Sequence, residues 1–158
     1  MSKTKPISSI KSIAVLGECM LELSSVKGST HSAKNMGFGG DTLNTSVYLS
    51  RAGKKVQFFT ALGDDDYSNW MLSEWNLEGI ATQYVRQIPG RVPGLYMIET
   101  DESGERRFHY WRDSAPARDL LNTTEKIAIP ASRATVVSKI DTAMAVLVID
   151  TSSPRYEP

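Results

Sequence analysis

The sequence places two adjacent glycines directly before a predicted helix. Gly39 and Gly40 precede Asp41 and Thr42, and Asn44 follows one helical turn after Asp41. Paired glycines let a backbone approach a ligand closely, and the first N–H groups of a helix are unpaired and carry a partial positive charge. These features suit the hydroxyl and carboxylate groups of a sugar acid. An ordinary strand-to-helix turn, with Asp41 as the helix cap, has the same pattern.

A second candidate group lies on a predicted β-hairpin. Residues Leu95–Thr100 and Arg106–Trp111 have strand-like composition, and a short loop that contains Gly104 joins them. This antiparallel unit interrupts the alternation of strands and helices in the preceding part of the chain. We therefore expect it to form a flap on a larger α/β core.

Aromatic side chains and one arginine share a face of this hairpin. Because side chains alternate along a strand, the residues expected on that face are Phe108, Tyr110 and Arg112, with Tyr96 on the facing strand. Arginine can bind a carboxylate through two parallel N–H groups, so this face could hold a hydroxylated acid. A cross-strand aromatic cluster that only stabilises the sheet is the alternative.

Several common catalytic patterns are absent from the sequence. Residues 37–42 lack the third glycine of the dinucleotide-binding fingerprint, and the phosphate-binding loop of P-loop enzymes is missing as well. His31 and His109 are the only histidines, which argues against a histidine-rich metal site. His109 and Trp111 fall on the opposite face of the hairpin, where we expect them to pack.

Three consecutive aspartates and a single cysteine have structural explanations. Asp64, Asp65 and Asp66 could suggest a metal site, but they precede a predicted helix, where a cap and first-turn anions are favourable. We expect them to start that helix and Gly79 to end it. Cys19 is expected to be a small buried hydrophobic residue, because nothing in the sequence suggests an activated thiol.

The composition limits the classes of partner. The chain of 158 residues carries 18 basic and 18 acidic side chains, so no excess of positive charge favours nucleic acid or lipid. No segment resembles a signal peptide or approaches the length of a membrane span. One cysteine cannot form an intrachain disulfide, which fits a reducing compartment. We expect a cytoplasmic protein with a small-molecule partner.

The elements that must position the candidate residues follow an α/β order. Residues 13–16 form a continuous apolar run typical of a strand buried on both faces, and residues 56–62 form another. The helix that starts at Asp41 should end at Gly53, where a left-handed cap favours glycine. Strand, glycine turn, helix and strand together predict a parallel sheet.

Other segments give weaker signals. Residues 20–23 suggest a short strand, and residues 26–35 are polar and predict a loop. Residues 122–139 lack clear amphipathic order, whereas residues 143–149 are apolar enough for one more strand.

The order of several separated motifs resembles that of the ribokinase-like (phosphofructokinase-B) carbohydrate kinases. Residues 39–46, Gly53 and residues 61–65 are similar to the first signature of that family. Further segments resemble its branch that acts on 2-keto-3-deoxygluconate, and these are residues 17–20, 93–96, 104–106 and 108–112. Thr42 and Ser68 depart from the wider family in the direction of that branch. The resemblance runs from about Ile13 to Leu121.

The resemblance implies a fold and a set of binding residues. The family fold is a three-layer α/β sandwich with a small β-sheet lid, here expected over residues 13–121 and followed by a divergent tail at 122–158. Glu18 lies near the family's first substrate contact, and Arg112 would lie near the substrate carboxylate. The substrate-binding residues implied are Gly40, Asp41, Thr42, Asn44, Tyr96, Tyr110 and Arg112.

The resemblance also implies an activity that this chain is expected not to complete. Family members are about twice as long, and their second signature supplies the catalytic aspartate and the phosphate site. Asp150-Thr151 begins like that signature, but the residues that follow do not match it. The family reaction would transfer a phosphoryl group from ATP, with Mg²⁺, to the terminal hydroxyl of 2-keto-3-deoxygluconate. We expect no catalytic residue in this truncated chain and little binding of ATP or Mg²⁺.

Two other functions stay open on the sequence. One is a non-catalytic fragment that binds sugar acids or forms a homo-oligomer through the edges of the lid sheet. The other is a kinase of another sugar, such as fructose.

Overall fold

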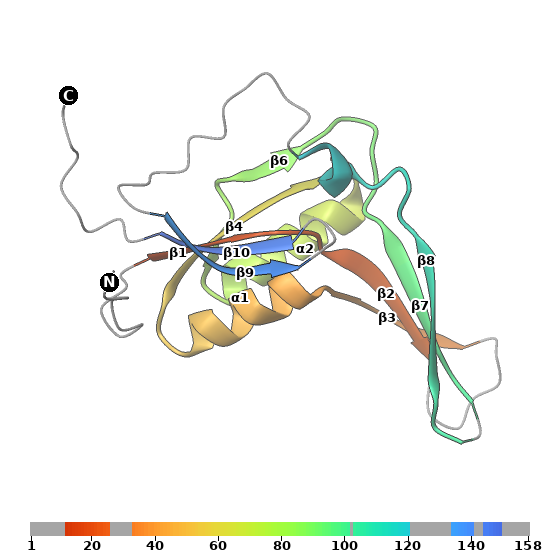
Figure 1. Ribbon diagram of the computed structural model, residues 1–158. Coiled ribbons are helices and arrows are strands. Elements are labelled where there is room, and N and C mark those ends of the chain that lie inside the picture. The colour runs from red at the N-terminus through yellow and green to blue at the C-terminus, as the bar shows by residue number, and fades with distance from the viewer. Residues whose placement is uncertain (1–11, 26–32, 102, 121–133, 141–143, 150–158) are drawn as a thin grey trace, which may run out of the picture.

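The computed structural model describes residues 12–25, 33–101, 103–120, 134–140 and 144–149. The chain forms two sheets, an α/β body and a lid that projects from it (Figure 1). In the described ranges no helix is long and apolar enough to cross a bilayer.

The body is built on a mixed sheet whose centre is parallel. Strands β1 (Ser12–Leu16) and β4 (Lys55–Leu62) pair in parallel, with Val15 opposite Phe58. Two short strands, β5 (Ile80–Ala81) and β6 (Val85–Gln87), also pair in parallel with β4. On the other side of β1 the pairing is antiparallel, first to β10 (Met144–Ile149) and then from β10 to β9 (Ala134–Ile140). The predicted parallel sheet is therefore confirmed for its centre alone.

Two helices cover one face of this sheet (Figure 1). Helix α1 spans Asp41–Arg51 and helix α2 spans Asp66–Leu77. Gly53 and Gly79 follow them with φ of 76° and 73°, the left-handed conformation that glycine adopts without steric cost. Both predicted helix ends are confirmed.

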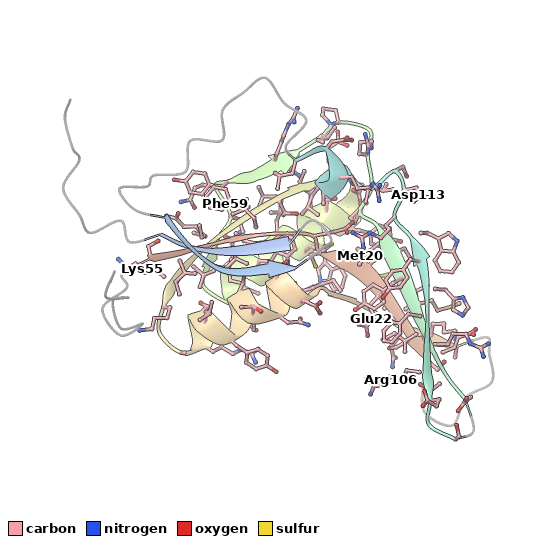
Figure 2. All side chains as sticks on the ribbon, viewed as in Figure 1. Met20, Glu22, Lys55, Phe59, Arg106 and Asp113 are labelled. Atoms are coloured by element: carbon pink, nitrogen blue, oxygen red, sulfur yellow. The ribbon has the colours of Figure 1, made fainter. Side chains whose placement is uncertain are left out.

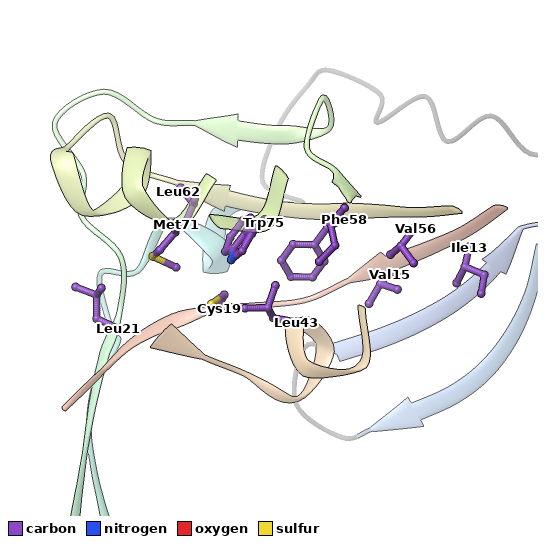
Figure 3. Packing of buried hydrophobic residues seen from close by; sticks show 11 residues of the cluster. Ile13, Val15, Cys19, Leu21, Leu43, Val56, Phe58, Leu62, Met71 and Trp75 are labelled. Atoms are coloured by element: carbon purple, nitrogen blue, oxygen red, sulfur yellow. The ribbon is translucent and has the colours of Figure 1, made fainter. Parts of the chain in front are cut away.

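The hydrophobic core lies between the sheet and the helices (Figure 3). Trp75 of α2 is fully buried and meets Phe58 of β4 edge to face, with 5.2 Å between ring centroids. Leu43 of α1 and Cys19 belong to the same cluster. Cys19 is thus a small buried residue, as expected, and its burial raises the pKa of the thiol well above its usual range.

The lid is a four-stranded sheet with the strand order β3, β2, β7, β8. Its strands are β2 (Met20–Ser25), β3 (Lys34–Gly39), β7 (Leu95–Thr100) and β8 (Arg106–Trp111). The central pair, β2 and β7, is parallel, and the outer strands pair antiparallel to them. The hairpin of β7 and β8 has the bounds expected from the sequence. After β8 the chain returns to the body through a 3₁₀ turn, η2 (Pro116–Asp119).

Three expectations for individual segments are wrong. Residues 34–39 form a strand and not a loop followed by a glycine turn, because β2 supplies hydrogen-bonding partners along their whole length. Residues 134–140 form β9, although no strand was expected there. Asp41 does not cap α1, since the cap position is Gly40 and no side chain bonds the first helical N–H groups.

Candidate functional site

The first group of predicted site residues lies at Gly40, between the end of β3 and the first turn of α1. Gly40 packs so closely on the backbone of Glu18 that a Cβ atom would collide with the Glu18 carbonyl oxygen. Thr42 is buried, and its hydroxyl donates a hydrogen bond of 3.4 Å to the same oxygen. The backbone N–H of Asn44 donates to the Gly40 carbonyl (2.8 Å), which starts the helical ladder.

The side chains of Asp41 and Asn44 are exposed at this helix end. Within the described residues neither side chain makes a hydrogen bond or an ion pair, so both can face a ligand. The backbone N–H groups of the first turn add a partial positive charge. This end of α1 can therefore accept hydroxyl or carboxylate oxygens, as the sequence predicts.

The second group forms an aromatic face on the lid sheet. Tyr96 of β7 lies directly opposite Tyr110 of β8, with ring centroids 6.0 Å apart. Phe108 lies 6.4 Å from Tyr96 and 6.3 Å from Tyr110, measured between ring centroids. Tyr96 is buried, whereas Tyr110 is 54% exposed. The shared face predicted from strand alternation is confirmed.

Glu22 belongs to this face, and sequence reasoning did not identify it. The residue lies on β2, in register with Tyr96, and its carboxylate accepts a hydrogen bond from the Tyr96 hydroxyl. Burial, together with this bond, raises the pKa of Tyr96 above its usual range. Figure 2 shows Glu22 on the lid beyond Met20, which marks the start of β2. The available signal was a polar residue between Leu21 and Leu23 in a strand-like run.

Arg112 and Glu18 form an ion pair at the root of the lid. Nη2 of Arg112 lies 2.5 Å from Oε2 of Glu18, and the two side chains are 32% and 9% exposed. Burial raises the pKa of the Glu18 carboxyl, and the charges of Arg112 and Arg118 oppose that rise. Within the described residues neither carboxylate oxygen accepts an aligned hydrogen bond, and the buried Nε of Arg112 has no acceptor.

The structure brings the two groups against each other through Gly39. A Cβ atom on Gly39 would lie 2.5 Å from the Tyr96 hydroxyl and 3.5 Å from the Glu22 carboxylate. The turn that leads into α1 thus runs directly beside the polar edge of the aromatic face. Glu18 makes the other connection, because it touches both the start of α1 and Arg112.

The opposite face of the lid carries His109 and Trp111. His109 lies 3.1 Å from Glu99 through Nε2 and stacks with Trp111, at 6.4 Å between ring centroids. Trp111 nevertheless is 55% exposed. The packing expected of these two residues is therefore confirmed between their rings.

The aspartate run serves α2 as predicted. The side chain of Asp65 accepts hydrogen bonds from the backbone N–H groups of Tyr67 (2.9 Å) and Ser68 (3.2 Å) and from the Ser68 hydroxyl (2.6 Å). The Asp64 side chain accepts one from the N–H of Gly90 (2.9 Å). Among the described residues no three His, Cys, Asp or Glu side chains group as a metal site would require.

Comparison with known proteins decides the family. The sequence profile of the pfkB family carbohydrate kinases matches residues 10–152. This chain belongs to the pfkB family of carbohydrate kinases. The ribokinase-like fold expected from the sequence motifs is confirmed, lid sheet included.

The curated relatives include 2-dehydro-3-deoxygluconokinases and fructokinases. The chain is 49% identical over 119 residues to the 2-dehydro-3-deoxygluconokinase of Dickeya dadantii, covering 73% of this chain and 37% of the relative. It thus spans little more than a third of the length of that relative.

Solved pfkB structures share the fold. That of 2-dehydro-3-deoxygluconokinase from Thermotoga maritima has a TM-score of 0.61 and 22% identity, covering 68% of this chain and 34% of that one. The structure of fructokinase from Xylella fastidiosa with bound ATP also has a TM-score of 0.61, at 25% identity, covering 68% of this chain and 32% of that one.

Proposed function

We propose that this chain forms the sugar-acid-binding part of a kinase for 2-keto-3-deoxygluconate, which is also called 2-dehydro-3-deoxygluconate. The observation that carries the proposal is the guanidinium of Arg112 at the lid root, next to a face lined by Tyr96 and Tyr110. Among common side chains arginine is the one that matches a carboxylate with paired N–H groups. A carbohydrate site with this group should favour an acid over a neutral sugar.

The other site residues would bind the hydroxyl groups of the sugar acid. The exposed Asp41 and Asn44 can accept and donate hydrogen bonds at the α1 end, beside the backbone of Gly40. Tyr96 and Tyr110 would contribute from the lid. Thr42 is buried on the Glu18 carbonyl, so its part is to hold the start of α1 in place.

The complete reaction belongs to a protein of the relatives' length. There, ATP would supply the phosphoryl group and Mg²⁺ would offset its charge, giving 2-keto-3-deoxygluconate 6-phosphate. The aspartate base that the family reaction needs is not assigned to any residue of this chain. We therefore propose binding without turnover for these 158 residues.

Calorimetric titration of the purified chain tests this function. 2-Keto-3-deoxygluconate should bind saturably and more tightly than fructose. Arg112→Ala should weaken binding of the acid by about 10- to 100-fold, as expected for a lost charge-assisted hydrogen bond, and leave fructose nearly unchanged. Arg112→Lys is the matched control, because it keeps the charge but loses the paired N–H geometry. Its affinity for the acid should lie between those of the wild type and Arg112→Ala. Equal losses for both sugars would exclude the acid assignment.

A kinase for fructose is the second candidate, and the likeness to fructokinases favours it. The same titration separates the two, since a fructose site would gain nothing from Arg112.

Pairing of two copies through the lid also stays a proposal. The exposed Trp111 and Met36 on the lid support it, and sedimentation velocity would test it by a concentration-dependent dimer that Trp111→Ser abolishes. The cytoplasmic location, the absence of nucleic-acid and membrane partners, and the domain boundary near Leu121 remain predictions.

A further inference from the structure

Glu18 touches every connection between the lid sheet and the body. The residue itself lies in the turn from β1 to β2, and its carbonyl oxygen meets Gly40 and the Thr42 hydroxyl at the start of α1. Its Oε1 atom would lie 3.1 Å from a Cβ placed on Gly94, which precedes β7. Its Oε2 atom contacts Arg112, which follows β8. One residue thus meets the chain at each of these crossings.

The carboxylate of Glu18 is a resident anion inside the candidate acid site. It is nine-tenths buried, and its ion-pair partner among the described residues is Arg112. Because neither of its oxygens accepts an aligned hydrogen bond in this part of the chain, the pair recovers only part of the free energy lost on desolvation. Arg112 also keeps a buried Nε without an acceptor among these residues. The guanidinium is therefore incompletely satisfied and retains capacity for a second acceptor.

The neighbouring arginines Arg91 and Arg118 do not replace Arg112 as the ion-pair partner of Glu18. Arg91 is held by the carbonyl oxygen of Ser114 at 2.6 Å and by the carboxylate of Asp119 at 3.0 Å. Arg118 acts on Glu18 through its charge and lowers the pKa of that carboxyl less than Arg112 does. A ligand carboxylate that reaches Arg112 would consequently share one guanidinium with Glu18.

We propose that Glu18 is a specificity-determining residue that acts through Arg112, because its carboxylate occupies the guanidinium in the ligand-free protein and competes with an incoming acid. The proposal rests on the proposed function, since it takes Arg112 as the carboxylate-binding group. When a small acid binds Arg112, its ion pair with the guanidinium replaces that of Glu18, so the net gain in binding free energy is small. A sugar acid gains further hydrogen bonds at the α1 end and on the lid. Glu18 therefore makes the site reject small carboxylates while it still accepts sugar acids.

The variant Glu18→Gln tests the proposal, because it keeps the shape of the side chain and removes the charge. In calorimetric titrations 2-keto-3-deoxygluconate should bind about tenfold more tightly to the variant than to the wild-type chain, and fructose should bind equally to both. If Glu18 had only a structural role, Glu18→Gln would bind both the acid and fructose more weakly. Weaker binding of the acid, or equal changes for acid and fructose, would overturn the proposal.

Glu99→Gln is the matched control for net charge. Glu99 is a lid carboxylate that pairs with His109 on the opposite face, away from Arg112. This variant should leave the affinities for both sugars unchanged. A gain for the acid as large as that of Glu18→Gln would show that net charge alone controls affinity, and would contradict the proposal.

Sodium acetate separates failure of this proposal from failure of the proposed function. If the wild-type chain binds no sugar acid, the proposed function is wrong. The role of Glu18 is then tested separately by the midpoint of thermal unfolding, measured in sodium acetate and in sodium chloride at equal ionic strength. The midpoint of Glu18→Gln should rise with acetate and that of the wild type should not. Equal responses would overturn the proposal.

A second readout uses the wild-type chain and needs no variant to fold. The ¹³C signal of the Glu18 carboxyl should move when 2-keto-3-deoxygluconate takes a share of Arg112. Acid binding with an unmoved Glu18 signal would contradict the competition.

Discussion

At Gly40 a single hydrogen atom separates the start of α1 from the carbonyl oxygen of Glu18. A methyl group there would press against the backbone of residues 18–19, since it would collide with the carbonyl oxygen of Glu18 and lie 3.4 Å from the Cα of Cys19. Neither backbone can move without shifting a strand or a helix. A methyl group placed on Gly37 of β3 would have no atom within 4 Å, so the two glycines of one run have different roles.

Gly40→Ala should therefore destabilise the chain by about 1–3 kcal/mol, the usual range for an overpacked interior position. Gly37→Ala should change the free energy of unfolding by less than about 0.5 kcal/mol, as for other surface substitutions. Urea unfolding followed by circular dichroism measures both. Similar losses for the two variants would mean that the contact of Gly40 with Glu18 does not control the junction.

Residue roles could be predicted where they depend on local periodicity. The shared face of Tyr96, Tyr110 and Arg112 follows from alternation along a hairpin whose strands are adjacent in sequence. The contacts of Glu22 with Tyr96 and of Glu18 with Arg112 join residues far apart in the chain. No local sequence pattern shows that β2 and β7 are neighbours. These two contacts therefore could not be predicted from the sequence and are known only from the structure.

At the scale of elements, the start of α2 rests on one side chain. Asp65 satisfies two of the N–H groups that a helix end leaves unpaired, and its second oxygen accepts from the Ser68 hydroxyl, which in turn accepts from the N–H of Gly63 (3.0 Å). The cap thus also fixes the turn that leaves β4.

Asp65→Ala should lower the free energy of unfolding by about 1–2 kcal/mol, the cost of a lost helix cap with its linked hydrogen bonds. Asp66→Ala is the control: that residue lies in the first turn and interacts with the helix dipole, worth about 0.3–1 kcal/mol. Chemical unfolding of both variants compares the two. A larger loss at Asp66 than at Asp65 would contradict the assignment of the cap.

Element boundaries were predictable where glycine or aspartate sets them. Gly53, Gly79 and Asp65 mark helix ends through their own conformation or hydrogen bonds. Strand β3 was missed because its glycines lower strand propensity, and only pairing with β2 makes it a strand. The cap of α1 was misassigned because the tight contact at Gly40, and not a side-chain hydrogen bond, determines where that helix begins.

At the scale of the whole molecule, the lid and the body meet at the junction around Glu18. The start of α1 belongs to the body and the tyrosines belong to the lid, so a ligand bound between them would contact both parts. This arrangement explains why motifs far apart in the sequence form one candidate site. Its central claim is that residues 40–44 and the strands β7 and β8 bind the same molecule.

Backbone amide NMR of the chain during titration with 2-keto-3-deoxygluconate tests this claim most directly. The amide signals of residues 40–44 and of Tyr96, Tyr110 and Arg112 should shift together and saturate at one ligand concentration, while those of α2 stay in place. Shifts confined to one of the two groups, or no shifts at all, would contradict a shared sugar-acid site.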